Sequence, residues 1–456
     1  MPLQKNQVLT LRVERLSSDG SGVAHSPDGE TVFIPGAAPG DEARVRIVKD
    51  CKRYAFGILD EVLTPSPDRI PVDCAVAGPC GGCSLRHLDY AAELRAKQEN
   101  VADAFARIGG LDVPVLPIVG SPEVNRYRNK VQFPVGVDKS GKPCIGFYAG
   151  RTHRIVPCPD CRLQPGVLNE IGNALCAFFA EKGIQPYSEE TGRGLVRHIF
   201  LRRGAHSGQI MVCLVCTRAK LPSAEELCTR LKAQFAEITT ILLNVNAKNT
   251  NVILGTETHT LYGPGYIEDT LCGVPVRLGP LSFYQVNTLA AEQLYGIAAQ
   301  YAQLTPDDLL LDLYCGMGTI GLSMAAHCRE LIGVEIVPEA IESAKANAAR
   351  MGADVAAKSR FFCADAGQAA TRLAAEGLHP DIVMLDPPRK GCDEATLSAV
   401  VRMSPRRVVY VSCNPATAAR DAAWLEQNGY HAEKVQPVDL FPRTRHCECV
   451  LSFSKV

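Results

Sequence analysis

The 456-residue chain lacks any long hydrophobic run. No stretch approaches the roughly 18 consecutive apolar residues that a membrane-spanning helix needs. The segment from Met1 to Lys5 also lacks the apolar centre of a secretory signal peptide. We therefore expect a cytoplasmic protein that has no membrane partner, and nothing in the sequence indicates an obligate protein partner.

The chain also has almost no net charge, with a formal value of −1, and it lacks a disulfide-rich composition. Its 48 Lys and Arg balance 49 Asp and Glu, so the total charge indicates no polyanionic partner, although such binding depends on local charge. The 19 cysteines are about 4% of 456 residues, well below the roughly 8–10% of a disulfide scaffold. In a reducing compartment these thiols are free, catalytic or bound to metal.

The remaining composition is that of an ordinary globular protein. Hydrophobic residues make up 46% and charged residues 21%, which excludes a disordered chain. At roughly 150 residues per domain, the length predicts about three domains. We expect a multidomain α/β protein with boundaries near residues 62 and 275.

Residues 1–62 show short alternating strands with glycine-rich turns and no helical pattern, which predicts an OB-like β-barrel. Residues 63–275 mix strands and helices and predict a central α+β domain. A helical pattern at 90–109 could pack on the catalytic domain. The segment from Ser121 to Arg203 holds 13 Lys or Arg and 7 acids, which makes it the most basic stretch.

Residues 276–456 alternate strands and helices regularly from Asp308 onward, which predicts an open parallel sheet with a Rossmann-like fold. The turn Gly316-Met317-Gly318 follows the first strand but lacks the third glycine of a dinucleotide fingerprint, so NAD binding is disfavoured. Glu335, Asp365 and Asp386 end the next strands. Acids at successive strand ends favour S-adenosylmethionine over merely solvated side chains.

A cysteine and a carboxylate stand out near the end of the chain. Cys413 ends the fifth strand, at the edge where ligands bind, and the helix that follows should lower its pKa. Glu448 opens an otherwise apolar strand, where it could act as a general base or simply pair with Arg443 or Arg445. A thiolate, a base and a methyl donor together suit uracil C5, because thiolate addition at C6 makes C5 nucleophilic.

An amino-group methylase is the rival chemistry. Asp386-Pro387-Pro388 resembles the signature of that class, in which an aromatic residue follows and stacks on the base. Arg389 follows here, so attack on an exocyclic nitrogen is disfavoured.

The sequence resembles the RNA (uracil-5-)-methyltransferase family over nearly its whole length. The motifs that carry the resemblance occur in the family's order: Phe283-Tyr284-Gln285-Val286-Asn287, Asp312–Gly318, Asp386-Pro387-Pro388-Arg389, Ser412-Cys413-Asn414-Pro415 and His446-Cys447-Glu448. The first 62 residues resemble the TRAM domain that precedes the iron–sulfur branch. The resemblance implies Cys413 as nucleophile and Glu448 as proton acceptor. It also implies that the pocket for the cofactor and the target base is lined by six residues: Gln285, Tyr314, Thr319, Glu335, Asp365 and Asp386.

Four further cysteines resemble the cluster ligands of that branch, namely Cys74, Cys80, Cys83 and Cys161. Their spacing alone leaves a [4Fe–4S] cluster and a four-cysteine zinc site both open. The resemblance favours the [4Fe–4S] cluster, in a structural role, and favours Cys161 over Cys158 as the fourth ligand.

The resemblance implies an RNA partner, most often large-subunit (23S-type) ribosomal RNA, with 5-methyluridine as the product. Candidate RNA contacts are Phe283 for stacking and Arg126, Arg128 and Lys130 for phosphates. A transfer RNA uridine is an alternative target. A catalytically silent RNA-binding or ribosome-assembly protein is an alternative function.

Overall fold

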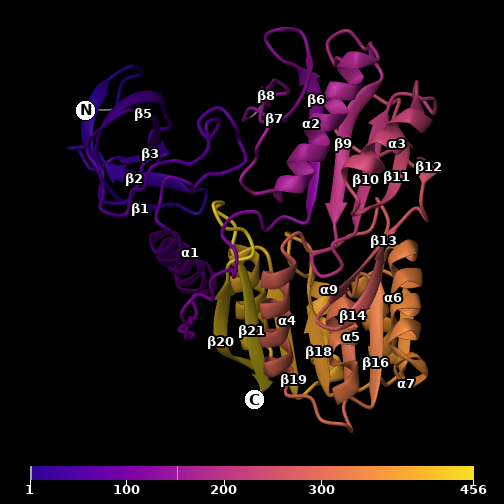
Figure 1. The fold of residues 1–456 in the computed structure, drawn as a ribbon. Coiled ribbons are helices and arrows are strands. Elements are labelled where there is room, and N and C mark those ends of the chain that lie inside the picture. The colour runs from indigo at the N-terminus through magenta and orange to yellow at the C-terminus, as the bar shows by residue number, and fades with distance from the viewer. Residues whose placement is uncertain (1–2, 151) are drawn as a thin grey trace.

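The computed structural model describes residues 3–150 and 152–456, and it contains three packed units (Figure 1). Arg151, one of the cations of the basic stretch, lies outside the described residues together with Met1 and Pro2. In the described part of the chain, no helix combines the length and the apolar character that crossing a bilayer requires.

The first unit is a closed five-stranded barrel with strand order β1-β2-β3-β5-β4, which confirms the predicted barrel. Its strands are β1 (Val8–Leu16), β2 (Ser21–His25), β3 (Thr31–Pro35), β4 (Glu42–Asp50) and β5 (Tyr54–Thr64). Alternate residues such as Val32, Ile34 and Val45 point inward and form one small core, while their neighbours point outward.

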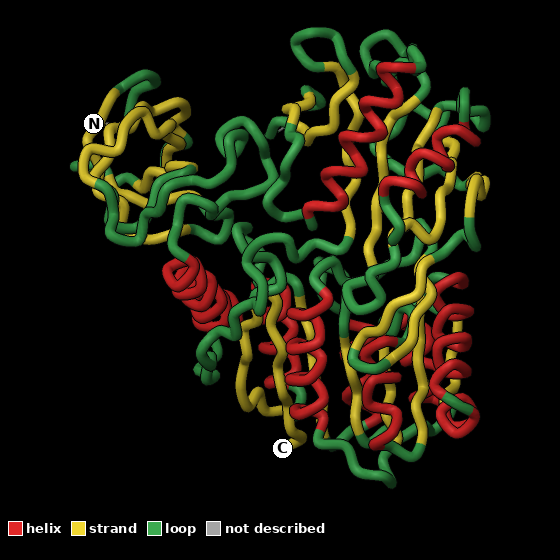
Figure 2. The backbone as a smooth tube through the Cα atoms, in the orientation of Figure 1, coloured by secondary structure: helices red, strands yellow, loops and turns green. Residues whose placement is uncertain are grey.

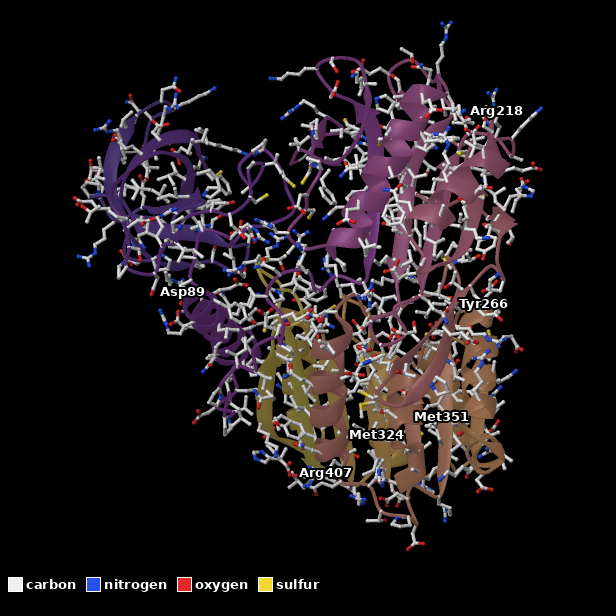
Figure 3. The ribbon with its side chains drawn as sticks, viewed as in Figure 1. Asp89, Arg218, Tyr266, Met324, Met351 and Arg407 are labelled. Atoms are coloured by element: carbon white, nitrogen blue, oxygen red, sulfur yellow. The ribbon has the colours of Figure 1, made fainter. Side chains whose placement is uncertain are left out.

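A loop and a helix join the barrel to the rest of the molecule. Helix α1 (Tyr90–Ala104) begins at Asp89, whose side chain accepts a hydrogen bond from the Ala91 amide at 3.1 Å (Figure 3). A π-helical turn, η1 (Phe105–Gly109), extends the helix until Gly110 ends it with a positive φ of 63°. Val101 and Phe105 belong to the core of the C-terminal unit, so this connector is packed rather than free.

The central unit is a seven-stranded sheet with order β12-β11-β10-β9-β6-β7-β8. The strands are β6 (Lys130–Val137), β7 (Pro143–Tyr148), β8 (Ile155–Pro157), β9 (Val196–Arg203), β10 (Ile210–Cys216), β11 (Ile238–Val245) and β12 (Glu257–Tyr262). Helices α2 (Gly166–Glu181) and α3 (Ala224–Gln234) pack on the sheet and bury a core that includes Leu175, Leu214 and Leu231 (Figure 2).

A two-stranded hairpin, β13 (Ile267–Leu271) and β14 (Val274–Leu278), follows the central sheet. Ile267, Leu271 and Val276 share a core with α4 (Thr288–Ala302) and with the C-terminal sheet. The hairpin therefore packs with the C-terminal unit, and the boundary expected near residue 275 falls inside it.

The C-terminal unit is a seven-stranded sheet with order β17-β16-β15-β18-β19-β21-β20. The strands are β15 (Leu309–Leu313), β16 (Glu330–Glu335), β17 (Ser359–Cys363), β18 (Ile382–Leu385), β19 (Arg407–Ser412), β20 (Tyr430–Val438) and β21 (Glu448–Lys455). The helices after α4 are α5 (Thr319–Met324), η2 (Ala325–His327), α6 (Pro338–Met351), α7 (Ala353–Lys358), α8 (Ala366–Ala375), α9 (Glu394–Met403) and α10 (Pro415–Gln427). The strands β15 to β19 are parallel, as the sequence predicted.

The parallel strands all end toward the central unit. Arg407, at the start of β19, lies at the lower edge of the sheet in Figure 3, so the strand runs upward to Ser412. Strand order reverses between β15 and β18, and ligands bind at the carboxyl edge of such a switch point. The candidate site therefore lies where the C-terminal sheet meets the central unit.

Candidate active site and cysteine cavity

The glycine turn after β15 forms one side of the candidate site. Gly316 and Gly318 have positive φ angles of 54° and 79°, a conformation that favours glycine. The Gly316 amide donates a hydrogen bond to Glu335 Oε2 at 3.2 Å, which joins the turn to the end of β16. Ile336, the next residue, is 62% exposed and offers an apolar surface beside this carboxylate. The Glu335 carboxylate can accept hydrogen bonds from the hydroxyl groups of a ribose, and the Ile336 side chain can pack against a flat aromatic ring.

Two further predicted acids lie at the same edge. Asp365 caps α8 by accepting a hydrogen bond from the Gln368 amide at 3.1 Å. Asp386 is half-buried, and burial raises the pKa of its carboxyl group to about 7. Asp312, inside β15, is buried with Oδ2 accepting from the Gly321 amide at 3.0 Å. Burial, followed by the charges of Asp386 and Glu335, raises the pKa of Asp312 to about 8.

Tyr295 of α4 is a site residue that the sequence analysis missed. It is buried, its hydroxyl group lies beside the side chains of Gln285 and Thr319, and the charge of Asp386 contributes to its raised pKa after burial. It therefore connects two predicted cofactor residues that lie 34 positions apart in the sequence. A tyrosine in an amphipathic helix has the same sequence pattern as a core residue, so no signal distinguished it.

Tyr314 lies at the end of β15 with a φ of 66°. Its hydroxyl group lies 3.4 Å from Thr396 Oγ1 of α9, and its ring packs against the apolar core on that side. The structure thus places the backbone of Tyr314 at the predicted pocket but directs its side chain toward α9.

Cys413 and Glu448 lie opposite each other. Strand β19 pairs antiparallel with β21, and Ser412 is the partner of Cys449. One step further in the same register sets Cys413 beside Glu448. The two residues lie 35 positions apart in the sequence and are therefore brought together at the carboxyl edge by the fold.

The charges at this pair determine its ionisation. Burial raises the pKa of the Glu448 carboxyl group to about 8, and Asp386 adds to the rise while Arg389 opposes it. The Cys413 thiol has a raised pKa as well, because burial and the charges of Glu448 and Asp386 outweigh Arg389. The expectation that the following helix would lower the Cys413 pKa is therefore wrong for the ligand-free protein.

Arg389 is the second residue whose role the sequence did not indicate. Its guanidinium group lies beside the Cys413 thiol and lowers the pKa of that thiol, and its charge also lowers the pKa of Glu448. Asn414 Nδ2 and Thr417 Oγ1 donate to the Arg389 carbonyl at 3.0 and 3.2 Å, which fixes this segment to the start of α10. The residue that replaces the aromatic position of amino-group methylases thus provides a cation beside the thiol.

The loop from Asp439 to Cys447, which leads into Glu448, is held by a buried ionic network. Lys97 of α1 donates to Glu93 at 2.7 Å, to Asp439 at 2.8 Å and to the Phe441 carbonyl at 3.1 Å. All three charged side chains are almost fully buried. The loop is the yellow segment above β20 and β21 in Figure 1, between α1 and the central unit.

The four predicted cluster ligands converge on one cavity of about 80 Å³. It is lined by the thiols of Cys74, Cys80, Cys83, Cys158 and Cys161. Cys158 hydrogen-bonds to Cys161, and this contact lowers the pKa of the Cys161 thiol. Within residues 3–150 and 152–456, no group of three or more His, Cys, Asp or Glu side chains is arranged to hold a metal ion.

Cations surround this cavity and are only partly neutralised. Arg86 is almost fully buried, its Nη1 donates to Asp73 at 2.8 Å, and its charge lies beside Cys83. In the described structure, Arg86 Nε and Nη2 and Arg128 Nε are buried without a hydrogen-bond partner. Unpaired buried donors are costly, so an anionic occupant such as a thiolate-bound cluster fits this cavity.

Three of the residues predicted to contact RNA differ in their environment: Arg126 is engaged by backbone carbonyls, Lys130 is half-buried and Phe283 is exposed. Arg126 donates to the carbonyls of Cys161 and Gln164 at 2.9 Å, so its side chain braces the cysteine loop. Lys130 is half-buried on β6, and burial and the charges of Arg202 and Arg128 lower its pKa to about 8. Phe283 is 73% exposed beside Gln285, which excludes core packing for its ring.

The segment that carries Phe283 and Gln285 is fixed by the central unit. Arg202 donates to the carbonyls of Gly279 and Ser282 at 2.9 and 2.7 Å. Asn129 Nδ2 donates to the Gln285 carbonyl at 2.7 Å. The central sheet therefore positions the wall of the candidate site.

Comparisons with known proteins identify related chains over the full length. The family model for tRNA (uracil-5-)-methyltransferase matches residues 207–456, and the TRAM domain model matches residues 2–59. An uncharacterized RNA methyltransferase of Halalkalibacterium halodurans is 43% identical over 98% of this chain and 97% of its own length. One from Bacillus cereus is 41% identical over 100% and 98%.

A solved structure is similar as well. The tRNA (uracil-54, C5)-methyltransferase of Pyrococcus abyssi, in complex with S-adenosyl-L-homocysteine, superposes with a TM-score of 0.78 at 26% identity. The match covers 98% of this chain and 100% of that chain.

Proposed function

The chain belongs to the tRNA (uracil-5-)-methyltransferase family of S-adenosylmethionine-dependent RNA methyltransferases, and from this premise we propose a covalent mechanism. In this proposal Cys413 bonds to C6 of a target uridine, and the methyl group is added at C5. The observation that carries the proposal is the register of β19 and β21, which sets the thiol opposite a buried carboxylate.

Each residue has one task in this scheme. The Cys413 thiolate, paired with Arg389, adds to C6, and the electrons of the C5–C6 double bond form the new C5–methyl bond. The methyl group would come from the sulfonium of S-adenosylmethionine, with the sulfur–methyl bond broken and the neutral thioether as the leaving group. Glu448 then removes the C5 proton, the double bond re-forms, and the bond between Cys413 and C6 breaks. The base needs a pKa near the working pH, and the value of about 8 for Glu448 meets that need.

S-adenosylmethionine, when bound, supplies the methyl group. The residues available to hold it are the glycine turn, Glu335 and Asp365, with Ile336 beside the adenine. Gln285 and Thr319, joined by Tyr295, would close the pocket next to Asp386. Tyr314 contributes backbone rather than its ring.

The test is adduct formation on RNA that contains 5-fluorouracil. A base cannot remove the fluorine at C5 as it would remove a proton, so the bond between the protein and C6 persists. The wild-type protein should form a denaturant-stable adduct, and Cys413→Ala should form none. Glu448→Gln should accumulate an adduct even on ordinary RNA, because the final proton removal fails. A Cys413→Ala protein that still methylates RNA would overturn the mechanism. A wild-type protein that methylates without any adduct would favour an amino-group target.

We further propose large-subunit ribosomal RNA as the substrate, on the strength of the barrel and the cysteine cavity. A transfer RNA uridine is the second candidate, because the similar Pyrococcus abyssi enzyme is named for one. Methylation assays with labelled cofactor on unmodified ribosomal RNA and transfer RNA separate the two. Label in neither RNA would favour a catalytically silent RNA-binding protein.

The proposal includes a [4Fe–4S] cluster held by Cys74, Cys80, Cys83 and Cys161. The thiols surround a cavity of about 80 Å³ instead of meeting at one point, as the ligands of a zinc ion would. The unpaired guanidinium nitrogens of Arg86 and Arg128 would offset the negative charge of such a group. When bound, the cluster would cross-link the loop after the barrel to the central unit.

For RNA, we propose Phe283 as a stacking surface and Arg128 and Lys130 as phosphate contacts, with Arg126 supporting them indirectly. Burial, followed by the charges of Arg202 and Arg128, lowers the pKa of Lys130 to about 8, and no ion pair neutralises its charge in the described part of the chain, so a phosphate beside these three cations would be bound strongly. Lys130→Gln should weaken RNA binding and reduce its salt dependence, measured by anisotropy over a range of salt concentrations.

A further inference from the structure

The outer surface of the barrel carries three aromatic rings in mutual contact. Phe33 of β3 lies 5.7 Å from Tyr54 and 5.9 Å from Phe56 of β5, between ring centroids. Tyr54 and Phe56 are 5.6 Å apart, with planes 88° to each other. The intervening residues Val32 and Ala55 fill the barrel core, so the rings point outward.

Basic residues border these rings. Lys49 of β4 pairs with Phe56, and Arg46 pairs with Ile58, which is 49% exposed and is the next outward residue of β5. The segment from Glu42 to Tyr54 holds five Lys or Arg and two acids. Arg46 has Asp60 as an ion-pair partner at 2.7 Å. By contrast, the described structure gives no ion pair to three exposed cations, Lys49, Lys52 and Arg53.

This face extends toward the end of the barrel that points away from the active site. Leu16, at the end of β1, packs with Leu85 and Leu88 next to α1. Gly20, in the following turn, lies close to Arg445 of the loop before Glu448. Val8, at the opposite end of β1, pairs with Arg46 of the basic border. Tyr54 pairs with Thr31, at the end of β3 that is farthest from Gly20, and Phe33 lies at the middle of β3. The rings therefore extend from the middle of the barrel toward the end that is remote from the catalytic edge.

We propose that this aromatic face, defined as Phe33, Tyr54, Phe56, Ile58 and Lys49, binds an unpaired stretch of the RNA substrate several nucleotides from the methylated uridine. The inference rests on the proposed function, which makes RNA the substrate. Exposed rings stack on bases of any sequence, and cations beside them contact the phosphates. Because the bordering cations lack acidic partners, the face suits a polyanion better than a neutral protein surface. RNA would be held at two places, the catalytic pocket and the far end of the barrel.

Binding of the full-length protein to a fluorescein-labelled oligouridylate tests the proposal. A length of about 16 nucleotides is at the upper end of OB-fold sites. Tyr54→Ala and Phe33→Ala should each weaken binding about tenfold, the order expected for loss of one stacked base. Tyr54→Trp should restore it. Tyr266→Ala is the matched control, because that ring lies over Arg277 in the hairpin far from the barrel. Unchanged affinity of Tyr54→Ala would overturn the proposal.

Methyl transfer to ribosomal RNA distinguishes failure of this inference from failure of the proposed function. If both hold, Tyr54→Ala raises KM about tenfold and leaves kcat unchanged. A fall in kcat at unchanged KM would overturn the inference, since it would indicate a structural effect. Wild-type protein that binds oligouridylate through Tyr54 but transfers no methyl group would overturn the proposed function alone. If Tyr54→Ala binds oligouridylate normally but no longer co-purifies with a protein that accompanies the wild type, the face binds a protein partner and the RNA proposal is overturned.

Discussion

Ionisation of single residues sets the rate of the proposed chemistry. Glu448 must be charged to remove a proton, and its pKa is raised to about 8 by burial first and by Asp386 second. Below that pH its charged fraction falls tenfold per unit. The Cys413 thiol also has a raised pKa, so its thiolate fraction changes in the same direction.

We therefore expect the rate of methyl transfer to rise with pH through about 8, where Glu448 titrates, and to go on rising above it, because the Cys413 thiol has a pKa raised from its ordinary value and is still losing its proton there. The measurement is single-turnover transfer at saturating RNA across this range. A rate that falls between pH 6 and 8 would contradict the assignment of Glu448 as the base.

Arg389 should control the reactivity of the thiol. Arg389→Gln removes the cation that lowers the Cys413 pKa, so alkylation of Cys413 by iodoacetamide near neutral pH should slow severalfold. Peptide mapping by mass spectrometry gives the rate at this cysteine, and the exposed Cys363 serves as internal control. Arg389→Lys should keep most of the reactivity, and equal slowing in both variants would exclude a charge effect.

The sequence indicated the proposed catalytic pair, Cys413 and Glu448, but it did not indicate which side chains surround that pair. Cys413 and Glu448 stand in local motifs, so they could be found from the residues alone. The effect of Arg389 on them, and the bridge that Tyr295 makes between Gln285 and Thr319, depend on contacts between distant segments. The direction of the Cys413 pKa was wrong because burial and two carboxylates outweigh the helix terminus, and neither effect is visible in the sequence.

Among the elements, helix α1 binds the loop from Asp439 to Cys447 through buried ion pairs and hydrogen bonds. The helical pattern at 90–109 predicted the helix, and its π-helical end at Phe105–Gly109 was not foreseen. Its first two turns supply Glu93 and Lys97 to the buried network around Asp439. A solvated i, i+4 ion pair would have the same sequence pattern, so only the fold shows that this pair is buried.

Lys97→Met should destabilise the protein by about 3–5 kcal/mol, because two buried carboxylates would lose their shared cation. Urea unfolding measures the loss. Lys345→Met is a suitable control, since Lys345 makes an exposed pair with Glu342 and should change stability by less than about 1 kcal/mol. If both substitutions lower the free energy of unfolding by the same amount, burial of the ionic network does not contribute to stability.

For the whole molecule, the three predicted units are present, but the way they meet was not predictable. Strand and helix alternation is a local pattern, whereas the packing of β13 and β14 on α4 joins segments from both sides of the expected boundary at 275. The cysteine cavity is another such junction. Its fifth thiol, Cys158, adjoins Cys161, although the resemblance had favoured Cys161 over Cys158.

Iron content should depend on the four proposed ligands and not on their neighbour. Anaerobically purified Cys161→Ser should lose most of its iron and its brown colour, while Cys158→Ser should retain both. Iron and sulfide analysis per chain is the measurement, with wild-type protein as reference. A colourless wild-type protein that contains zinc would contradict the cluster, and retention of iron by Cys161→Ser alone would assign the fourth ligand to Cys158.

The position of β21 in the sheet has a consequence for biosynthesis. This strand follows all the others in chain order, yet it is inserted between β19 and β20 and begins with Glu448. A nascent chain can complete the barrel, the central sheet and the parallel strands while this slot stays open. In the proposed mechanism the thiol therefore emerges from the ribosome before its base, and a methylated product is released only after β21 has been inserted.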